Sequence, residues 1–581
     1  MNPATLLARL AVEALVAAGV RHAVLCPGSR SAPLAYALAA AEALGGPVLH
    51  VRHDERVAAF TALGAGTAGA GPAAVVTTSG TAVANLHPAV LEAHHADRPL
   101  VVVTADRPRA LRGTWANQTT ELQAGLFGAA LRGVLDLEDV DAAKDPDAAR
   151  ARLDALLASA RGGPAGRAGP VQLDLGFGEP LLPDGDDLPW VLPARRPHRA
   201  APAGRPGPAP ASPPADPLEL PPGARTVVLA GDGAGPDARA LAERAGWPLL
   251  AEPSSGARGG PNAVGPYRLL LELDAWGGAV ERAVVFGRPT LSRPVTRLVG
   301  RPDVDVVLVS PYPDRPEPGR PVRRAVHVTA PAPEASSGRR LRSWRVAGRA
   351  AAAAIDGVLD GEAAAGRLTG PWLARELAAA LRPGELLVTA ASNPVRDLDL
   401  AARPLPDGPA AHVIANRGLA GIDGTVSTAL GAALAAGVPA RVLVGDVAFL
   451  HDLGALLAGP REARPDLQIV VLNDDGGGIF SLLEHGGLAE AGPEQAAAFD
   501  RLFGTPHGAD LASLCRGFGV RHERVGDAAR ARAVLAEPAP GVSVVEVPAD
   551  RSGLRALHAR LRSAAHVAAH EAAHAAPHVA G

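Results

Sequence analysis

Short, almost uninterrupted apolar runs alternate with stretches of helical periodicity along most of this chain. In its first third these runs are residues 22–26, 73–78, 100–104 and 171–175. A strand that is apolar on both faces is typical of a parallel sheet covered by helices on both sides, whereas a half-exposed strand alternates apolar and polar residues. The pattern therefore predicts an α/β fold built from open, mostly parallel sheets flanked by helices.

The same alternation returns in two later regions, which predicts three α/β domains. Residues 225–230 open the second region, and residues 386–389, 412–416 and 542–547 are strand candidates of the third. A segment rich in Pro, Ala, Arg and Gly separates the first two regions; it cannot bury enough apolar surface to fold alone and is predicted to be a linker. The predicted bounds are 1–183 for the first domain, 184–223 for the linker, 224–340 for the central domain, 341–560 for the third domain and 561–581 for a His- and Ala-rich tail.

The composition is consistent with a chain of several domains, and it limits the classes of molecule that we expect the protein to bind. The chain has 581 residues, of which 47% are apolar, enough for substantial cores. A net charge of -3 provides no basic field for nucleic acid or an acidic membrane, so we expect a small-molecule substrate and no nucleic-acid partner. Cys26 and Cys515 are the only cysteines, which excludes a disulfide framework and a zinc–thiolate cluster. Because charged residues interrupt every long apolar stretch, we expect no membrane span and a cytoplasmic protein.

Two carboxylates follow consecutive strand candidates of the third region. The first strand ends at Gly445-Asp446, and the second, one βαβ step later, ends at Asn473-Asp474. Such a step brings both strand ends to one edge of a parallel sheet. Mg²⁺ prefers hard oxygen ligands, which Asp446, Asp474 and a carbonyl of the Gly-rich turn 476–478 could supply beside a diphosphate. Each dipeptide taken alone is also an ordinary turn after a strand.

The interval between these dipeptides resembles the thiamine-diphosphate motif, commonly Gly-Asp-Gly followed by Asn-Asn. Here 25 residues lie between Val447 and Asn473. Val447 stands where the motif has its last Gly, and Asp474 stands where it has the second Asn, the usual metal ligand. Asp474 keeps an oxygen ligand and adds a negative charge, so this change favours metal binding.

A further carboxylate, Glu55, opens a helix candidate in the first region. It lies between a short apolar run at 47–50 and the helical stretch 57–64. A thiamine enzyme needs a carboxyl group at the ring nitrogen N1′ of the aminopyrimidine, which favours the tautomer that removes the thiazolium proton. Glu55 is the candidate, although a carboxylate there also complements a helix dipole. The next strand and the Ser-Gly-Thr turn at 79–81 resemble the pyrimidine-binding domain of thiamine enzymes.

Two other motifs allow competing interpretations. Glycines within residues 231–235 follow a strand and suggest a dinucleotide site, but the motif spacing is broken and a tight turn is preferred. In the tail, His566, His570, His574 and His578 would share one face of a helix and could bind a metal. Low complexity and the terminal position favour a solvated tail instead.

The chain as a whole resembles the 2-succinyl-5-enolpyruvyl-6-hydroxy-3-cyclohexene-1-carboxylate (SEPHCHC) synthase family, which depends on thiamine diphosphate. The resemblance spans all three regions and is carried by the segments 26–31, 52–56, 104–108, 116–118, 416–418, 421–424 and 477–480. It implies a three-domain thiamine-diphosphate-enzyme fold, in which residues 1–183 bind the pyrimidine and residues 341–560 bind the diphosphate and the metal ion.

The resemblance also implies roles for individual residues. The cofactor would contact Glu55, Ile422, Gly445, Asp446, Asn473, Asp474 and Gly476. Mg²⁺, or Mn²⁺ in its place, would be bound by Asp446, Asp474 and Gly476. The residues expected at the substrates are Ser29, Arg30, Arg107, Asn117, Gln118, Arg293, Ser392, Arg396, Arg417, Ile479, Phe480 and Leu483. Those expected to take part in catalysis are Glu55, Arg30, Arg107, Gln118, Arg396 and Arg417.

The implied activity is a transferase reaction of menaquinone biosynthesis. Thiamine diphosphate would support the decarboxylation of 2-oxoglutarate and the conjugate addition of a succinyl carbanion equivalent to isochorismate, giving SEPHCHC and CO₂. Both substrates are multiply anionic, so planar guanidinium groups are the expected clamps. In the family the cofactor lies between subunits, which implies a homodimer or a dimer of dimers. The alternatives are another thiamine-diphosphate-dependent 2-oxoacid decarboxylase or acetohydroxyacid synthase, and a non-catalytic protein that kept the fold.

Overall fold

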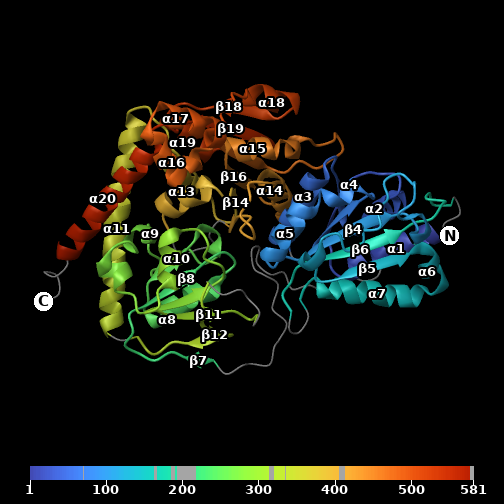
Figure 1. The fold of residues 1–581 in the computed structure, drawn as a ribbon, viewed down its shortest axis with the longest axis horizontal. Helices are drawn as coiled ribbons and strands as arrows, with labels where there is room; N and C mark the ends of the chain where they lie inside the picture. The colour runs from blue at the N-terminus through green and yellow to red at the C-terminus, as the bar shows by residue number, and fades with distance from the viewer. Residues whose placement is uncertain are drawn as a thin grey trace. The chain divides into compact units, whose positions relative to one another are not determined.

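The computed structural model describes residues 1–69, 71–162, 166–184, 190, 192, 217–312, 319–333, 335–404 and 412–575. The chain divides into two compact units, and Figure 1 labels their elements. The first unit comprises Met1–Ser212, Asn416–Ala440 and His451–Leu467, and the second comprises Pro213–Ala415, Arg441–Leu450 and Gln468–Gly581. Most of the predicted linker lies outside the described residues, and the predicted domain bounds stay a prediction. Each unit is described by itself.

The first unit contains a parallel sheet of six strands with helices on both faces. In sheet order the strands are β2 (Val48–Val51), β1 (His22–Leu25), β3 (Ala73–Thr77), β4 (Leu100–Asp106), β6 (Pro170–Gly176) and β5 (Val134–Glu138). One face packs against α1 (Pro3–Ala17), α2 (Ala32–Ala43) and α7 (Pro146–Ser159), and the other against α3 (Glu55–Ala68) and α5 (His87–His95). Along β4, Val101 and Val103 face the first group of helices, and Leu100 and Val102 face the second. Both faces are therefore buried, which explains the uninterrupted apolar runs.

The second unit contains two larger sheets. The central sheet is parallel, with five strands in the order β12 (Arg323–Ala325), β11 (Asp305–Val309), β10 (Arg282–Phe286), β8 (Thr226–Ala230) and β9 (Leu249–Ala251). The other sheet has six strands in the order β15 (His412–Ile414), β14 (Leu386–Thr389), β16 (Ala440–Gly445), β17 (Leu467–Asn473), β19 (Val542–Pro548) and β18 (Arg521–Arg524). The helices used below are α9 (Tyr267–Leu270), α10 (Arg293–Gly300) and α13 (Asn393–Ala401).

The predicted α/β class is confirmed by these sheets. The strand candidates from the sequence coincide with β1, β3, β4, β6, β8, β14, β15, β16, β17 and β19. Within the described residues, no helix combines the length and the apolar character needed to cross a bilayer.

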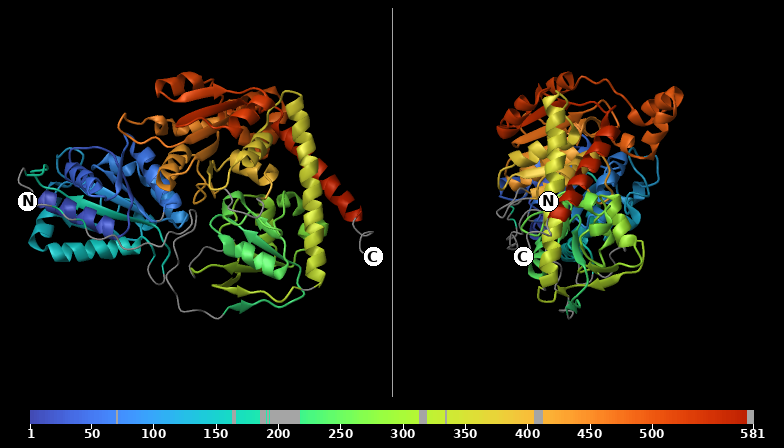
Figure 2. Two further views of the ribbon diagram at one scale, coloured as in Figure 1. Left: turned by 180° about the vertical axis from the view of Figure 1, so that it is seen from behind. Right: turned by 90° about the vertical axis from the view of Figure 1, so that its left-hand side faces the viewer.

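The C-terminal segment is a helix that packs on the second unit. α20 (Leu554–Ala575) lies beside the long helix α11 (Ala335–Ala364), as both views in Figure 2 show. Leu561 and Ala569 of α20 are buried. The expectation of a solvated tail is therefore wrong for the part of the tail that the structure describes, because small alanine side chains let this helix pack closely. His578 lies outside that part, and no three His, Cys, Asp or Glu side chains within it come together as a metal site.

Two helices of the first unit approach each other at glycines. Gly64 belongs to α3, and Gly431 belongs to α14 (Thr425–Ala436). A Cβ atom on Gly64 would lie 1.9 Å from the carbonyl oxygen of Thr428, and one on Gly431 would lie 1.9 Å from the carbonyl oxygen of Thr61. Both distances are far below van der Waals contact, so only glycine fits at either position. The close contact fixes the position of α3.

Adding one methyl group at this contact should destabilise the first unit. We expect Gly64→Ala to lower the free energy of unfolding by about 1–3 kcal/mol, because the two backbones must move apart. The control is Gly357→Ala in α11, where a Cβ would meet nothing within 4 Å. There alanine should raise stability by about 0.5–1 kcal/mol, since glycine weakens a helix interior. Thermal unfolding followed by circular dichroism measures both, and an unchanged midpoint for Gly64→Ala would contradict the close contact.

Candidate active site

The carboxylate of Asp446 lies at the carboxyl end of β16, where Gly445 ends the strand and α15 (Asp446–His451) begins. Asp446 is 1% exposed, and its oxygens accept hydrogen bonds from the N–H groups of Val447, at 2.7 Å, and Gly476, at 2.9 Å. Burial raises the pKa of Asp446, and the hydrogen bonds from Gly476 and His507 oppose that rise. Asp446 is thus an acceptor held in a fixed position by the backbone.

His507 is a contact of Asp446 that the sequence did not indicate. Its Nε2 atom lies 3.2 Å from Asp446 Oδ2, although 61 positions separate the two residues. The N–H of Ala509 donates to His507 Nδ1 at 3.0 Å, so Nδ1 is an acceptor and the ring proton lies on Nε2. The ring therefore donates a hydrogen bond from Nε2 to the carboxylate of Asp446. No local motif marks this histidine.

Asp474 directly follows β17 and lies close enough to Asp446 for their charges to interact. Burial, and then the Asp446 carboxylate, raise the pKa of Asp474 to about 7. A Cβ atom on Gly478 would lie 2.1 Å from Asp474 Oδ2, so glycine leaves the space that this carboxylate occupies. The carbonyl of Gly476 is a third hard oxygen, and it accepts the N–H of Gly478 at 3.0 Å with one of its two lone pairs. A buried and a half-buried carboxylate that repel each other, beside a carbonyl, are a donor set that fits Mg²⁺.

Asn473, the last residue of β17, makes contacts that shape the turn after this strand. Its Nδ2 donates to Glu546 Oε1 at 2.9 Å, and its Oδ1 accepts the N–H of Asp475 at 3.1 Å. Arg551 donates from Nη1 to the carbonyl of Asp474 at 2.7 Å. These bonds join the end of β17 to β19 and fix the direction of the turn.

In the first unit, Glu55 is the first residue of α3 and is half-buried. Its neighbour makes the helix cap, because Asp54 accepts the N–H groups of Arg56, at 2.8 Å, and Val57, at 3.1 Å. Capping therefore does not require Glu55, which leaves its carboxylate available for another role. Burial, and then Glu55, raise the pKa of the Cys26 thiol, which places the Glu55 carboxylate near the end of β1.

The segment that precedes Glu55 is anchored by Glu462. Glu462 Oε2 accepts the N–H of Val51 at 2.9 Å and Arg52 Nη1 at 3.4 Å. Arg52 is 1% exposed, and burial lowers its pKa. Glu462, which belongs to the same unit, therefore fixes the turn between β2 and α3.

Two predicted substrate arginines lie close together in the first unit. Arg107 donates from Nη1 to Ser79 Oγ at 3.1 Å and to the carbonyl of Gln118 at 2.9 Å. Arg30 donates from Nη1 to the carbonyl of Phe177 at 2.8 Å. Burial, and then the charge of Arg107, lower the pKa of Arg30. Two neighbouring guanidinium groups that repel each other form a place where an anionic group is stabilised.

The loop beside these arginines is positioned by Gln123, which the sequence did not single out. Gln123 is fully buried, and its Nε2 donates to the carbonyl of Ala105 at 3.1 Å and to Asp174 Oδ1 at 2.9 Å. Its Oε1 accepts the N–H of Gly80 at 2.9 Å. Ser29, Asn117 and Gln118 are exposed.

Arg417 and Ile422 also belong to the first unit. Arg417 is 3% exposed, and the residues beside it are bonded: Asn416 Nδ2 donates to Thr428 Oγ1 at 3.0 Å, and the N–H of Gly418 donates to Glu92 Oε1 at 2.6 Å. Ile422 is half-buried. Of the residues predicted to be catalytic, the first unit therefore holds Glu55, Arg30, Arg107, Gln118 and Arg417.

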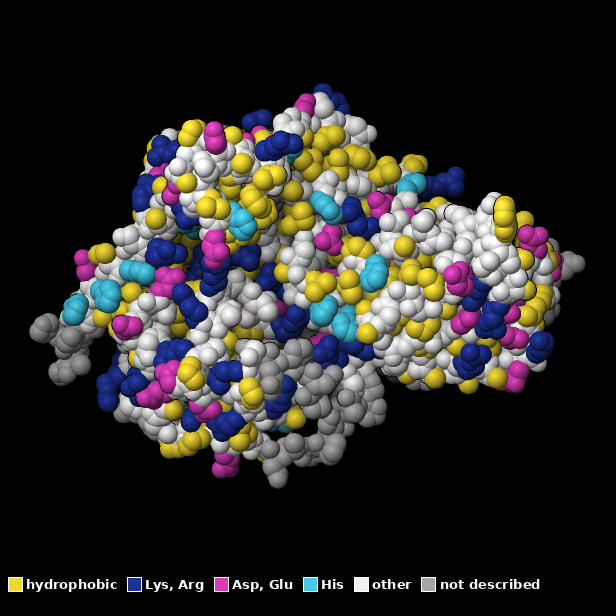
Figure 3. Space-filling model, viewed as in Figure 1, with side chains coloured by type: hydrophobic (Ala, Val, Ile, Leu, Met, Phe, Trp, Pro, Cys, Tyr) yellow, Lys and Arg dark blue, Asp and Glu magenta, His cyan; other side chains and the backbone are white. Residues whose placement is uncertain are grey.

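A cavity in the second unit brings together four of the predicted substrate residues. Its volume is about 800 Å³, and the four are Arg293, Arg396, Ile479 and Leu483. Arg396 donates from Nη1 to the carbonyls of Ala391, at 3.0 Å, and Ser392, at 2.8 Å, so the first turn of α13 orients this guanidinium. Lys and Arg side chains gather over α9 and α10 in the space-filling view (Figure 3). Guanidinium groups beside an apolar wall suit an anionic organic ligand.

Phe480 does not join this cavity. It packs against Phe503, with ring centroids 5.5 Å apart, and is not among the lining residues of the described chain. Ser392 contributes its carbonyl to Arg396, as described above, and precedes the lining residue Asn393.

The sequence matches known protein families and proteins along most of its length. Residues 6–126 match the family model of the N-terminal TPP-binding domain of thiamine pyrophosphate enzymes, and residues 400–547 match that of the C-terminal TPP-binding domain. A 2-succinyl-5-enolpyruvyl-6-hydroxy-3-cyclohexene-1-carboxylate synthase of Kineococcus radiotolerans is 52% identical over 97% of this chain and 99% of its own length. The chain belongs to the SEPHCHC synthase family. Proteins of the same name from a Nocardioides species and from Paenarthrobacter aurescens are 49% and 50% identical, over 96% of this chain and 98% and 96% of their own lengths.

Membership of the SEPHCHC synthase family confirms the predicted family and the thiamine-diphosphate-enzyme fold. Thiamine pyrophosphate and thiamine diphosphate are the same compound, so the two matched domains also confirm the predicted cofactor. Glu55 lies within the first match, and Asp446 and Asp474 lie within the second. All three relatives carry one enzyme name, which gives no support to the alternative decarboxylase or acetohydroxyacid synthase.

Removing one carboxylate of the proposed metal site should weaken the binding of Mg²⁺. We expect Asp474→Ala to raise the dissociation constant of Mg²⁺ about tenfold or more in the presence of thiamine diphosphate, since a hard oxygen ligand is lost. Asp474→Asn should lie between this variant and the parent protein, because the amide keeps an oxygen donor without the charge. Isothermal titration calorimetry measures all three.

The matched control is Asp475→Asn. Asp475 is exposed and accepts the N–H groups of His507 and Gly508, which an amide oxygen can also accept. This variant should bind Mg²⁺ as the parent does. Parent-like affinity in Asp474→Ala would remove Asp474 from the metal site.

Proposed function

We propose that this chain decarboxylates 2-oxoglutarate with thiamine diphosphate and adds the resulting succinyl unit to isochorismate, giving SEPHCHC and CO₂ for menaquinone biosynthesis. The observation that carries the proposal is the identity of 52% over 97% of this chain to a relative of that name. The cavity in the second unit supports it, because its arginines suit multiply anionic substrates.

Mg²⁺ and the cofactor diphosphate belong to the second unit in this proposal. Asp446, Asp474 and the carbonyl of Gly476 would hold the ion, with Mn²⁺ as a substitute of similar chemistry. His507 would keep the Asp446 carboxylate oriented through its Nε2–H. Gly445 and Asn473 would lie beside the diphosphate at the two strand ends.

Thiamine diphosphate, when bound, supplies the electron sink into which a 2-oxo acid loses CO₂. Glu55 holds a proton at the ring nitrogen N1′ of the aminopyrimidine, which is the acid–base role that the cofactor requires. Ile422 supports the cofactor with an apolar side chain. The cap made by Asp54 and the anchor made by Glu462 keep the Glu55 carboxylate in place without engaging it.

The substrates are bound through their carboxylates. The arginines proposed to bind these carboxylates are Arg30, Arg107, Arg293, Arg396 and Arg417. Ser29, Asn117, Gln118 and Ser392 provide neutral hydrogen bonds near the reacting atoms. Ile479 and Leu483 form an apolar surface that limits the access of water to the decarboxylated substrate.

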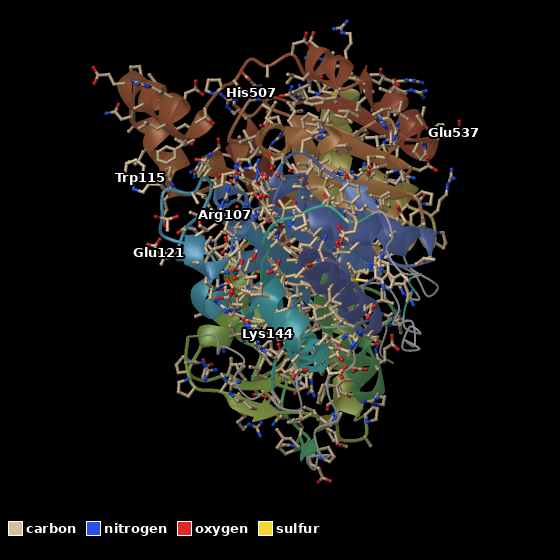
Figure 4. All side chains as sticks on the ribbon, turned by 90° about the vertical axis from the view of Figure 1, so that its right-hand side faces the viewer. Arg107, Trp115, Glu121, Lys144, His507 and Glu537 are labelled. Atoms are coloured by element: carbon tan, nitrogen blue, oxygen red, sulfur yellow. The ribbon has the colours of Figure 1, made fainter. Side chains whose placement is uncertain are left out.

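Self-association as a homodimer or a dimer of dimers is part of the same proposal. Trp115 is fully exposed, and Leu111 and Leu122 of the same loop are 42% and 62% exposed. Trp115 stands out from the loop that also carries Arg107 (Figure 4). Apolar side chains exposed together favour burial in an interface, and symmetric pairing with a second copy is the commonest way to achieve it.

The proposed reaction is tested by the choice of substrates. With thiamine diphosphate and Mg²⁺, the protein should release CO₂ from 2-oxoglutarate when isochorismate is present and form one SEPHCHC per CO₂. Pyruvate alone should give no turnover, because it lacks the second carboxylate that the arginines bind. Mass spectrometry of the product and a CO₂ assay decide this. Turnover of pyruvate without 2-oxoglutarate would instead support the alternative decarboxylase or acetohydroxyacid synthase.

The acid–base role of Glu55 predicts a selective loss of chemistry. Glu55→Gln should reduce CO₂ release about 100-fold or more, because an amide cannot exchange a proton with N1′. The binding of Mg²⁺ and thiamine diphosphate, measured by calorimetry, should change little. The control is Asp54→Asn, which removes an adjacent charge and keeps a good helix cap, so turnover should persist. Undiminished CO₂ release by Glu55→Gln would exclude the proposed role.

A further inference from the structure

The cavity of the second unit holds more positive charge than the predicted residues account for. Besides Arg293 and Arg396, it is lined by Arg268 of α9, by Ser292 at the start of α10 and by His558 of α20. Arg268 is half-buried. None of these three residues was selected from the sequence, because none lies in a segment that carries the family resemblance.

Arg268 forms no close ion pair within the part of the chain that the structure describes. Its guanidinium has no carboxylate within 4.0 Å and forms no hydrogen bond there, although it lines the same cavity as Glu272, Asp274 and Asp397. Asp397 is a buried carboxyl that interacts with the charges of both Arg268 and Arg396. Burial raises the pKa of Asp397 to about 7 despite both arginines, so this carboxyl is a weak source of compensating charge.

His558 adds no negative charge and stays neutral. Burial, and then Arg268 and Arg562, lower the pKa of His558 to about 3. Its ring therefore presents a neutral nitrogen to the cavity at neutral pH. A half-buried guanidinium beside a neutral imidazole is costly unless an anionic group offsets its charge.

Three buried polar atoms of the lining residues also lack hydrogen-bond partners within the described chain: Ser292 Oγ, Asn393 Oδ1 and His558 Nε2. Ser292 is 8% exposed, and its Oγ forms no hydrogen bond with any described residue. The Nε2 atom of His558 is likewise buried without a partner in the described chain. Ser292 precedes α10 without capping it through its side chain, so the hydroxyl is not used by the helix. Buried polar atoms without partners are unfavourable, and ligand oxygen atoms would satisfy them.

We propose that Arg268, Ser292 and His558 form a second carboxylate subsite in this cavity and that it binds isochorismate, the larger of the two substrates. This inference rests on the proposed function. A cavity of about 800 Å³ accommodates more than a five-carbon dicarboxylate. Isochorismate carries one carboxylate on its ring and a second on its enolpyruvyl side chain. Two carboxylates match two groups of guanidinium residues, and the ring carbons match the apolar lining residues Ile479, Leu482 and Leu483.

The test measures the binding of isochorismate to the protein loaded with thiamine diphosphate and Mg²⁺ but without 2-oxoglutarate, so that no product forms. Arg268→Gln should raise the dissociation constant about tenfold or more, because a charge-assisted hydrogen bond is lost. Arg268→Lys should recover part of the affinity, since it keeps the charge but not the planar geometry. The control is Arg349→Gln on α11, an exposed residue outside the cavity, which should leave the affinity unchanged.

Steady-state kinetics separate this subsite from a structural role. Arg268→Gln should raise KM for isochorismate and leave kcat and KM for 2-oxoglutarate nearly unchanged. Parent-like binding of isochorismate by Arg268→Gln, or equal weakening by Arg349→Gln, would overturn the subsite. If Arg268→Gln does not fold, Ser292→Ala decides: it should raise the dissociation constant about threefold or more, and an unchanged value would overturn the proposal.

The two proposals fail in different ways. If the parent protein forms no SEPHCHC from 2-oxoglutarate and isochorismate, the proposed function is wrong. If the parent protein is active and its Arg268 and Ser292 variants bind isochorismate normally, only the subsite is wrong.

Discussion

The rest of this structure depends on one constraint, which is that the negative charge of poorly solvated carboxylates in or just after parallel strands must be compensated. The two units compensate this charge in different ways. In the first unit, Asp106 at the end of β4 and Asp174 in β6 face Arg112, at 2.8 Å and 3.6 Å. The protein there supplies its own cation. In the second unit, no Arg or Lys of the described chain pairs with Asp446 or Asp474, and the side-chain partner in ion-pair range there is the ring of His507. A site built in this way needs a positive charge from outside, which the proposed divalent ion would provide.

Glycines, which have no side chain, help to position the helices and the carboxylate of the proposed cofactor site. Gly64 and Gly431 let the backbones of α3 and α14 touch, and Gly478 leaves room for the Asp474 carboxylate. At Gly64 and Gly431 a Cβ atom would collide with a backbone carbonyl, whereas at Gly478 it would collide with the Asp474 side chain. The helix that begins at Glu55 is therefore placed by close backbone approach, which is stiffer than contact through flexible side chains.

The arginines of this chain differ in the groups that hold them. Arg107 and Arg396, which we propose to bind substrate carboxylates, each donate to backbone carbonyls that orient the guanidinium. Arg112 and Arg375, in contrast, pair with several carboxylates and are neutralised inside the fold. The difference between a structural and a ligand-binding arginine therefore lies in its partners. With 57 Lys and Arg residues in the chain, residue type alone cannot show it.

The sequence alone was enough to predict the α/β class and the strand candidates, because these features follow from local periodicity. It also predicted the cofactor motif around Asp446 and Asp474 and the position of Glu55 at a helix start, because short motifs indicate them. The same reasoning missed His507, Gln123 and Arg268, and it wrongly left the histidine-rich tail in solvent. His507 reaches Asp446 across 61 positions, and α20 is ordered by burial of small side chains against distant helices. Such contacts depend on how the chain packs, since burial and the distances between charges are properties of the folded protein. The tertiary structure likewise decides which arginines form salt bridges and which line the cavity, because burial removes water from a charge and makes it costly to leave that charge uncompensated.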